Sequence, residues 1–275
     1  MKDKISITIN EKVLRDIDSI VDNLIIRNRS QAIEYLIKEA LKESKIAVIL
    51  AGESCKSTKK LKNRYSLIVN HLSIIERIIK KLGDSGFKTI YIIANHQTLT
   101  NIFKIVEDGS NFNVKIEFIS EEFPEGTASA LKLLKGKIKK TFLVVHYDVV
   151  LDNINLLELW QQHLKERKVA TILASIPIIK RESQIHGHLI LEGSNVLAYN
   201  EHPSLKKVGS SAFSRGIWIM EPEIFGYAGK SLEMDVFPRL AERRLLGCQM
   251  NSADHYHIHT HDDLVEVRKK IAEKR

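Results

Sequence analysis

Residues 46–64 read IAVILAGESCKSTKKLKNR, an apolar run that turns at Ala51-Gly52 into a long polar loop. The consecutive apolar residues from Ile46 to Leu50 predict a strand that is buried on both faces of a sheet. The loop that follows is rich in lysine. In an open α/β sheet, ligands bind at the carboxyl ends of the strands. We therefore expect the first strand of an α/β domain here, with a phosphate-bearing ligand at its loop.

The rest of the chain continues this pattern. Apolar residues recur at helical spacing from Ile74 to Leu82 and stop at Gly83, and residues 89–94 form the next buried strand pattern. Further strand or helix patterns follow at residues 114–119, 128–134, 142–145 and 156–164. Such alternation predicts a Rossmann-like, mostly parallel sheet covered by helices on both faces.

Length and composition set outer bounds. A chain of 275 residues suits a small module joined to a larger domain. No apolar run approaches the roughly 20 residues that span a bilayer, and the first residues lack a signal-peptide pattern, so we expect a cytoplasmic protein with no membrane partner. Cys55 and Cys248 are too few for a disulfide framework and are expected to be reduced thiols.

The first 44 residues have a pattern of their own. Lys4 to Asn10 alternates between apolar and polar residues, which predicts a short strand. Asn10 and Ser30 are good N-caps for two helical patterns, the first up to Leu24 and the second up to Leu41. We expect domains at residues 1–44 and 45–275, joined by a stiff linker of Ser44 and Lys45.

This strand-helix-helix order resembles the ribbon-helix-helix family of DNA-binding proteins, which pair two chains through their strands. The resemblance implies a homodimer or higher homo-oligomer that binds double-stranded DNA. The implied DNA contacts are Lys2, Lys4, Ser6, Thr8, Arg29 and Ser30. The net charge of +8 resides wholly in the large domain, because residues 1–44 hold equal numbers of acidic and basic residues. A purely dimerising module is therefore the alternative, since phosphate contacts supply most affinity for DNA.

The large domain resembles the sugar-phosphate nucleotidyltransferases. Ala47 to Gly52 is similar to the opening strand of that family, and Glu125-Gly126-Thr127 begins a segment similar to its G-T-A-G-A-L motif. Asp148 takes the place of an aspartate that binds the catalytic metal. The resemblance implies a nucleotide, sugar nucleotide or sugar phosphate ligand, contacted by Gly52, Gly126, Thr127, Gly187 and Glu201.

Several residues depart from the family pattern. Glu53, Cys55 and Ser57 replace loop residues that handle phosphates, and Arg64 stands for a lysine. His257 replaces the carboxylate that is the second metal ligand. Since phosphoryl transfer depends on positioning and charge neutralisation, these changes predict a domain without catalysis.

The histidines at 255, 257, 259 and 261 repeat every second residue, so on a strand they would share one face. Together with Asp148 and His146 they could bind zinc or manganese. Ordinary polar histidines are the alternative.

Our leading hypothesis from the sequence is a DNA-binding dimeric transcriptional regulator with an inactive nucleotidyltransferase-like domain that senses a ligand or acts as a scaffold. The first alternative is an active metal-dependent sugar-1-phosphate nucleotidyltransferase. It would use Asp148 and Arg64 with Mg²⁺, Mn²⁺ or Zn²⁺, and its N-terminal module would dimerise it or repress its own gene. A protein that binds DNA without sequence preference is the third possibility.

Overall fold

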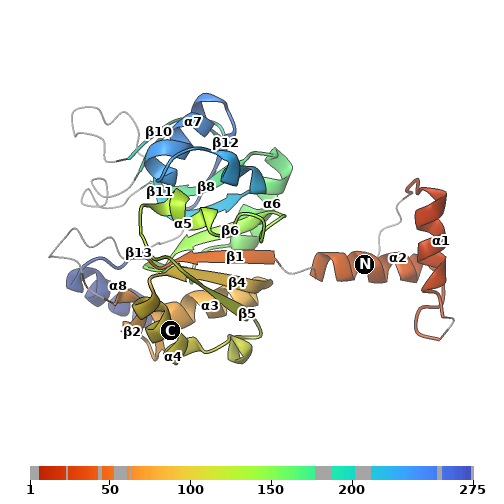
Figure 1. The fold of residues 1–275 in the computed structure, drawn as a ribbon, viewed down its shortest axis with the longest axis horizontal. Helices are drawn as coiled ribbons and strands as arrows, with labels where there is room; N and C mark the ends of the chain where they lie inside the picture. The colour runs from red at the N-terminus through yellow and green to blue at the C-terminus, as the bar shows by residue number, and fades with distance from the viewer. Residues whose placement is uncertain are drawn as a thin grey trace. The chain divides into compact units, whose positions relative to one another are not determined.

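The computed structural model describes residues 6–22, 24–42, 45–52, 61, 63–176, 187–201, 212–252 and 256–273. The chain divides into two compact units, Met1–Ser44 and Lys45–Arg275. Figure 1 shows the large unit as a twisted sheet with helices on both faces.

Nine strands form the central sheet, in the order β5-β4-β1-β6-β11-β8-β12-β10-β9. They are β1 (Lys45–Leu50), β4 (Phe87–Ala94), β5 (Lys115–Ser120), β6 (Phe142–His146), β8 (Ala170–Ser175), β9 (His188–Glu192), β10 (Asn195–Asn200), β11 (Ala212–Met220) and β12 (Leu246–Met250). Two small ribbons accompany the sheet, β2 (Ile68–Val69) with β3 (Leu72–Ser73), and β7 (Val149–Val150) with β13 (Tyr256–His257).

The sheet is mixed, which corrects part of the sequence prediction. Strands β5, β4, β1 and β6 are parallel, as the alternating pattern predicts. Strand β11 then runs antiparallel between β6 and β8, and β10 and β9 continue antiparallel at the edge. Continuous apolar character indicates a strand buried on both faces but does not give its direction, so the pattern of β11 could not reveal this reversal.

Strand β1 is central because it carries both hydrophobic cores. Ala47 and Ile49 pack into one cluster with helices α3 (Ile74–Asp84), α4 (His96–Val106), α6 (Leu156–Glu166) and α8 (His261–Glu273). Val48 and Leu50 pack into the other cluster, with α5 (Thr127–Lys132) and α7 (Phe237–Glu242). Successive side chains of a strand point to opposite faces, so an uninterrupted apolar run is what a sheet covered on both sides requires.

Helices α3, α5 and α6 of the large unit lie at patterns named from the sequence, whereas α4, α7 and α8 were not predicted. The helices are α3 (Ile74–Asp84), α4 (His96–Val106), α5 (Thr127–Lys132), α6 (Leu156–Glu166), α7 (Phe237–Glu242) and α8 (His261–Glu273), with the shorter turns η1 (Arg64–Ser66), η2 (Ser110–Phe112), η5 (Pro222–Gly226) and η6 (Leu232–Val236). Ser73 and Glu76 form a capping box that fixes the start of α3.

The small unit contains α1 (Glu11–Ser19) and α2 (Arg29–Lys42). Asn10 caps α1 as predicted, because its side chain accepts a hydrogen bond from the backbone of Lys12. Asn28 rather than Ser30 caps α2: its Oδ1 accepts from the backbone N–H of Gln31 at 3.0 Å. The helix therefore begins one residue before the predicted cap.

The predicted strand at residues 4–10 is not seen where the structure describes it. Residues 6–10 carry no strand, and exposed Ser6 and Thr8 lie in this segment, while Lys2 and Lys4 lie outside the described residues. Arg29 does not stand free for a phosphate, because its guanidinium donates two hydrogen bonds of 2.7 Å to the carboxylate of Asp18. This interaction lowers the pKa of Asp18.

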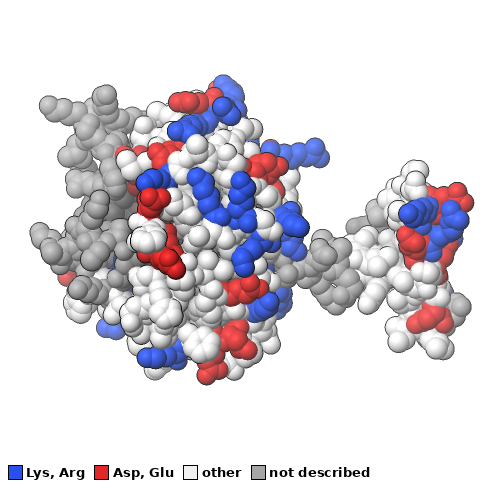
Figure 2. All heavy atoms as spheres, in the orientation of Figure 1, with Lys and Arg blue, Asp and Glu red and all other residues white. Residues whose placement is uncertain are grey.

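The surface charge follows the sequence distribution. Figure 2 shows basic side chains gathered in the middle of the visible face of the large unit, with acidic ones beside them, and both signs on the small unit. Among the residues that the structure describes, no helix combines the length and apolar character needed to cross a bilayer.

Candidate active site

Asp148 lies at the carboxyl ends of β6 and β1. The backbone N–H of Tyr147 donates to the carbonyl of Leu50 at 3.2 Å, so the turn after β6 sits against the end of β1. The backbone N–H of Ile258 donates to the carbonyl of Asp148 at 3.0 Å, which joins the segment after β13 to this turn. The carboxylate of Asp148 is buried.

Arg64 fills the space beside that carboxylate. Its Nη1 donates to Oδ2 of Asp148 in an ion pair whose two side chains are only 9% and 8% exposed. Its Nη2 donates to the hydroxyl of Tyr147 at 2.5 Å, and the guanidinium carbon lies 4.8 Å from the centre of that ring. The structure thus brings together the two residues that the sequence names as catalytic candidates.

Two imidazoles complete this cluster. Nδ1 of His257 lies 3.8 Å from Oδ1 of Asp148, and Nδ1 of His259 lies 3.4 Å from Oδ2. The two rings are nearly parallel, with an angle of 11° between them. Of the other predicted histidines, His255 lies outside the described residues and His261 is exposed at the start of α8. Among the described histidines of this row, His257 and His259 therefore lie at Asp148, whereas His261 does not.

The electrostatics favour an ionised Asp148. Burial alone would raise the pKa of this carboxyl group. The interaction with His257 and the charges of Arg64 and His259 outweigh burial and hold the pKa well below its usual range. The site therefore presents a permanent carboxylate to any cation that enters it.

Gly216 closes the other side of the cluster. Its φ of +63° is a conformation that favours glycine. A Cβ atom at this position would lie 3.1 Å from Cδ2 of His146 and 3.4 Å from Cε1 of His257. A glycine here lets β11 approach both imidazoles closely.

Gly126 and Thr127 lie at the start of α5, against the chain segment 230–233. A Cβ atom on Gly126 would lie 2.6 Å from the carbonyl oxygen of Lys230, and φ at Gly126 is +142°. The hydroxyl of Thr127 accepts from the backbone of Leu232 at 2.8 Å and donates to the carboxylate of Glu233. The predicted nucleotide contacts are therefore anchored to a segment far along the sequence.

Glu233 links the start of α5, with Gly126 and Thr127, to the cluster around Asp148. Its Oε1 lies 3.6 Å from Nε2 of His146. Burial lowers the pKa of His146, but the carboxylate of Glu233 outweighs burial, so that the pKa rises above its ordinary value. Sequence reasoning did not name Glu233, although the segment 231–240 in which it lies resembles the nucleotidyltransferase family, and this resemblance was the available signal.

Gly187 and Glu201 lie together, as their proposed shared ligand requires. A Cβ atom on Gly187 would lie 2.5 Å from Oε2 of Glu201 and 2.0 Å from the hydroxyl oxygen of Tyr199. That hydroxyl donates to Oε2 of Glu201 at 2.9 Å. Burial, followed by the charge of Glu201, raises the pKa of Tyr199 well above its ordinary value. Tyr199 is a further site residue that the sequence did not reveal.

Gly52 lies at the end of β1, beside an acidic residue that sequence reasoning missed. A Cβ atom on Gly52 would lie 3.3 Å from Oε2 of Glu121, and burial raises the pKa of that carboxyl group. The loop residues 53–60 and 62 lie outside the described residues. The next described residue is Leu61, whose backbone N–H donates to the carbonyl of His259 at 3.0 Å.

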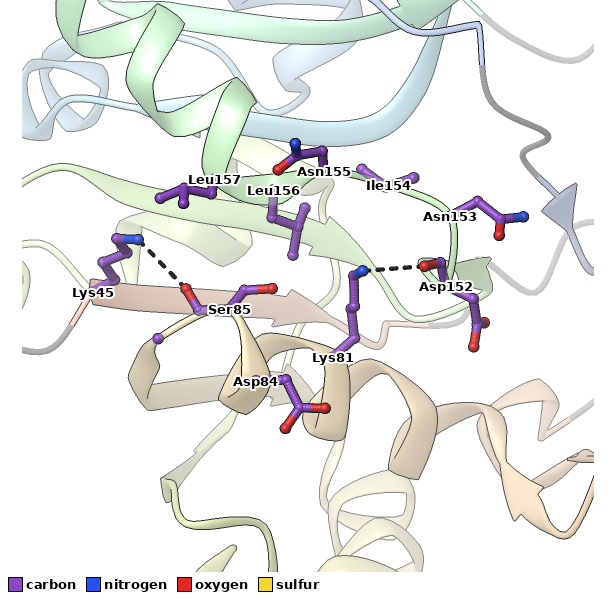
Figure 3. A pocket seen from close by; sticks show the side chains of 11 residues that line it. Lys45, Lys81, Asp84, Ser85, Asp152, Asn153, Ile154, Asn155, Leu156 and Leu157 are labelled. Atoms are coloured by element: carbon purple, nitrogen blue, oxygen red, sulfur yellow. Dashed lines mark hydrogen bonds between the residues drawn. The ribbon is translucent and has the colours of Figure 1, made fainter.

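A cavity of about 590 Å³ opens at the amino end of β1. Figure 3 shows Lys45 and Lys81 in its wall, each hydrogen-bonded to a backbone carbonyl, that of Ser85 at 3.4 Å and that of Asp152 at 3.1 Å. None of the predicted site residues lines this cavity. We therefore place the candidate active site at the opposite, carboxyl end of the strands.

The fold and this cluster define an α/β domain that presents its ligand-binding groups at the carboxyl ends of the strands. The Nucleotidyl transferase family model matches residues 46–274, and the chain belongs to that family.

Curated relatives are enzymes of this kind. The mannose-1-phosphate guanyltransferase of Aspergillus oryzae is 27% identical over 170 residues, which are 60% of this chain and 46% of that protein. The UTP--glucose-1-phosphate uridylyltransferase of Synechocystis is 24% identical over 188 residues, which are 62% of this chain and 48% of that protein. The chain therefore spans about half the length of these relatives.

Solved structures support the fold. UDP-glucose pyrophosphorylase complexed with UDP-glucose matches with a TM-score of 0.69 at 15% identity, covering 84% of this chain and 100% of the other. HddC from Yersinia pseudotuberculosis, complexed with GMP-PN, matches with a TM-score of 0.66 at 20% identity, covering 82% and 99%.

These comparisons contradict our leading hypothesis of a DNA-binding transcriptional regulator with an inactive domain. The family and its relatives are transferases, and the family match begins at residue 46, beyond the small unit. The hypothesis treated each changed residue by itself. In the structure, the imidazoles of His257 and His259 and the guanidinium of Arg64 surround Asp148, so the changed residues still concentrate cation-binding and cationic groups at one point.

Proposed function

We propose that the protein is a sugar-1-phosphate nucleotidyltransferase, the first alternative from the sequence. The observation that carries the proposal is the convergence of Asp148, Arg64, His257 and His259 at the carboxyl ends of β1 and β6 in a chain of the Nucleotidyl transferase family. The named activities of the curated relatives support it.

In the proposed reaction, a phosphate oxygen of the sugar 1-phosphate attacks the α-phosphorus of a nucleoside triphosphate. The bond from that phosphorus to the oxygen bridging the α- and β-phosphates breaks, and pyrophosphate leaves. Such a reaction requires alignment and neutralisation of negative charge more than covalent help from the protein. Arg64 supplies a fixed positive charge at the proposed reaction centre.

The residues present fit a divalent cation. The carboxylate of Asp148 and the ring nitrogens of His257 and His259 could hold it, since their ligand atoms all lie within 4.8 Å of one another. A bound cation would add positive charge next to the phosphates. Without it, Asp148 pairs with Arg64, which keeps the guanidinium in position.

The sugar would bind near Gly187. Glu201 accepts a hydrogen bond from Tyr199 at 2.9 Å, and a carboxylate can accept further bonds from sugar hydroxyls. The absence of a side chain on Gly187 leaves room for Tyr199 and Glu201 to meet. We assign the part of the site around Gly187 and Glu201 to the sugar, and the part around Gly126 and Thr127 to the nucleotide.

Glu121 favours guanine as the base. An ionised carboxylate offers only acceptors. Among the common bases, guanine presents two adjacent N–H donors, N1–H and the N2 amino group, on one edge, whereas uracil presents a single N–H between two acceptors. Glu121 lies beside Gly52 at the end of β1 and five residues before Gly126 in the sequence, and we assign the base to this end of the site. The relatives include both guanyltransferases and a uridylyltransferase, so this preference rests on Glu121.

We propose that the small unit is a dimerising module of the ribbon-helix-helix type. Large apolar side chains lie exposed on it, with exposed fractions of 78% for Leu24 and 85% for Ile25. Apolar surface of this kind is buried when a second copy packs against it. Light scattering of the full chain should give a dimer mass, and Ile7→Asp combined with Leu36→Asp should give a monomer. A monomer for the unmodified chain would refute this assignment.

The enzymatic proposal is tested by pyrophosphate release. Purified protein would be incubated with each common nucleoside triphosphate, a hexose 1-phosphate and a divalent cation, and the sugar nucleotide identified by mass. Asp148→Ala should abolish release, whereas Asp84→Ala, which removes an exposed carboxylate paired with Lys80, should not. A folded protein that releases no pyrophosphate with any triphosphate, sugar phosphate or cation would refute the proposal.

A further inference from the structure

Asp148 and the two imidazoles beside it are an unusual ligand set for a magnesium enzyme. We propose that Asp148, His257 and His259 form one site that selects a transition-metal ion of the Zn²⁺, Co²⁺ or Mn²⁺ class over Mg²⁺. The role of this ion in catalysis rests on the proposed function, but the ligand set and its selectivity do not.

The geometry is close to that of a bound ion. The ligand atoms of the three residues all lie within 4.8 Å of one another, and the Nδ1 atoms lie 3.4 Å and 3.8 Å from the nearer oxygens of Asp148. Ligand atoms that each contact one ion at about 2.1 Å in a tetrahedron lie about 3.4 Å apart. The Nδ1–oxygen distances are near this value already, and the widest pair of ligand atoms must close by up to about 1.4 Å when an ion binds.

The donor chemistry decides which ion fits. Mg²⁺ prefers oxygen ligands in an octahedron and gives up water reluctantly. Imidazole nitrogen suits Zn²⁺ and other first-row transition metals, whose affinity for nitrogen-containing sites exceeds that of Mg²⁺. With one carboxylate against two imidazoles, Asp148, His257 and His259 supply a donor set of the second kind.

The histidines are held in place by their surroundings. Strand β13 pairs with β7, which sets His257 opposite Val149. The carboxylate of Asp263 accepts hydrogen bonds from the backbone N–H groups of His259 and Thr260 at 2.9 Å and 2.7 Å. Ligands fixed in this way need little ordering when an ion binds, and rigid placement is what selective metal sites share.

Arg64 must yield when the ion arrives. Its Nη1 contacts both Oδ2 of Asp148 and, at 2.9 Å, Nδ1 of His259, which are two of the three atoms that the ion needs. The guanidinium and the metal ion are therefore competitors for the same electron pairs. The ion would release Arg64 toward the phosphates of a substrate.

The test uses direct metal binding by the full-length chain, not activity. Protein stripped with a chelator would be titrated with CoCl₂ while its visible d–d absorption is followed, and with ZnCl₂, MnCl₂ and MgCl₂ by calorimetry. We expect one equivalent of Co²⁺ or Zn²⁺ to bind at least about 100-fold more tightly than Mg²⁺.

Variants identify the ligands. His259→Ala should weaken Co²⁺ binding by about 10- to 100-fold and change the absorption spectrum, with little effect on weak Mg²⁺ binding. His261→Ala is the matched control, because it removes an exposed histidine two residues away and should leave binding unchanged. His257→Asp should shift preference toward Mg²⁺, because it adds a carboxylate in place of an imidazole.

Three results would overturn the assignment: equal affinity for Co²⁺ and Mg²⁺, undiminished Co²⁺ binding in a folded His257→Ala/His259→Ala double variant, or no binding at all. Each can occur whether or not the protein releases pyrophosphate. Failure of the metal assignment is therefore distinguishable from failure of the proposed function. Circular dichroism of every variant confirms that it is folded.

Discussion

Arg64 and Asp148, 84 residues apart in the sequence, form a buried ion pair at the carboxyl end of β1. Tyr147 holds the guanidinium from a second direction through its hydroxyl group and its ring. Both charges are therefore held in place in the metal-free protein. Under the metal assignment above, an ion that binds to Asp148 takes the place of the guanidinium, which then becomes available to the phosphates of a substrate.

Removing Arg64 should affect stability as well as activity. Arg64→Met leaves a buried carboxylate without its main cation, and we expect a loss of about 3 kcal/mol in the free energy of unfolding and a loss of pyrophosphate release. Arg244→Met is the control, because the side chains of Arg244 and its partner Glu192 are 66% and 60% exposed, and it should cost less than about 1 kcal/mol. Denaturant titration measures both. Equal costs would show that burial of the Arg64 pair contributes nothing. Added Co²⁺ should stabilise the folded Arg64→Met variant more than the unmodified protein.

Gly187 should not tolerate a methyl group. A Cβ atom there would lie 2.0 Å from the hydroxyl oxygen of Tyr199, so Gly187→Ala must displace that side chain and its bond to Glu201. We expect the KM for the sugar phosphate to rise about tenfold, because misplacing a positioning group weakens binding. Gly226→Ala is the control, since nothing lies within 4 Å of its Cβ position. An unchanged KM in Gly187→Ala would remove Glu201 from the sugar site.

Glu121 should set the choice of nucleotide. Glu121→Gln replaces one acceptor by a donor, so the variant should lose at least about tenfold in kcat/KM for GTP and gain for UTP, whose base offers both an acceptor and a donor. Competition assays with equal concentrations of the two triphosphates measure the ratio. Glu122→Gln, an exposed neighbouring change, should leave the ratio as it is. A ratio unaltered by Glu121→Gln would place the base elsewhere.

Acid stability should depend on Glu221. Nε2 of the buried His163 lies 3.0 Å from Oε1 of Glu221, and the hydroxyl of Thr141 donates to the same oxygen at 2.7 Å. The bond with His163 is the main cause that lowers the pKa of Glu221 from its ordinary value of 4.5. A carboxyl group with a lowered folded-state pKa stabilises the fold above its unfolded-state pKa, and this stabilisation is lost as the pH falls through the folded-state value.

We therefore expect the free energy of unfolding to fall more steeply below about pH 4.5 in the unmodified protein than in Glu221→Gln. Urea titrations between pH 3 and pH 7 would show the difference in slope. Glu192→Gln removes a carboxylate from an exposed pair with Arg244, and its free energy of unfolding should change with pH as that of the unmodified protein does. If the free energy of unfolding has the same pH dependence in Glu221→Gln and in the unmodified protein, Glu221 does not contribute to acid stability.

The sequence predicted the framework of the large unit because buried strands and amphipathic helices have distinct periods. The run from Ile46 to Leu50 indicated a strand covered on both sides, and Ala47 and Val48 do pack into opposite cores. The direction of β11 was not predictable, since residues buried on both faces look alike in parallel and antiparallel strands.

The sequence predicted only those site residues whose type is required by the short motif in which they lie. Asp148 and Gly187 were found through the motifs around them. Glu121 and Glu233 were missed, because each acts through a partner that the fold brings from elsewhere in the chain. Tyr199 was missed although its partner Glu201 is two residues away, because the sequence does not show that the two side chains meet beside Gly187. The family and the curated relatives contradict the predicted loss of catalysis. Judging residues one at a time could not show that imidazoles and a guanidinium gather around one carboxylate.

The bond between Leu61 and His259 joins segments 198 residues apart, and Arg64 reaches His259 across 195. Until the segment carrying His259 has left the ribosome, Asp148 has neither imidazole beside it. A nascent chain therefore cannot form the proposed metal site until the segment carrying these histidines has been synthesised and has paired with β7.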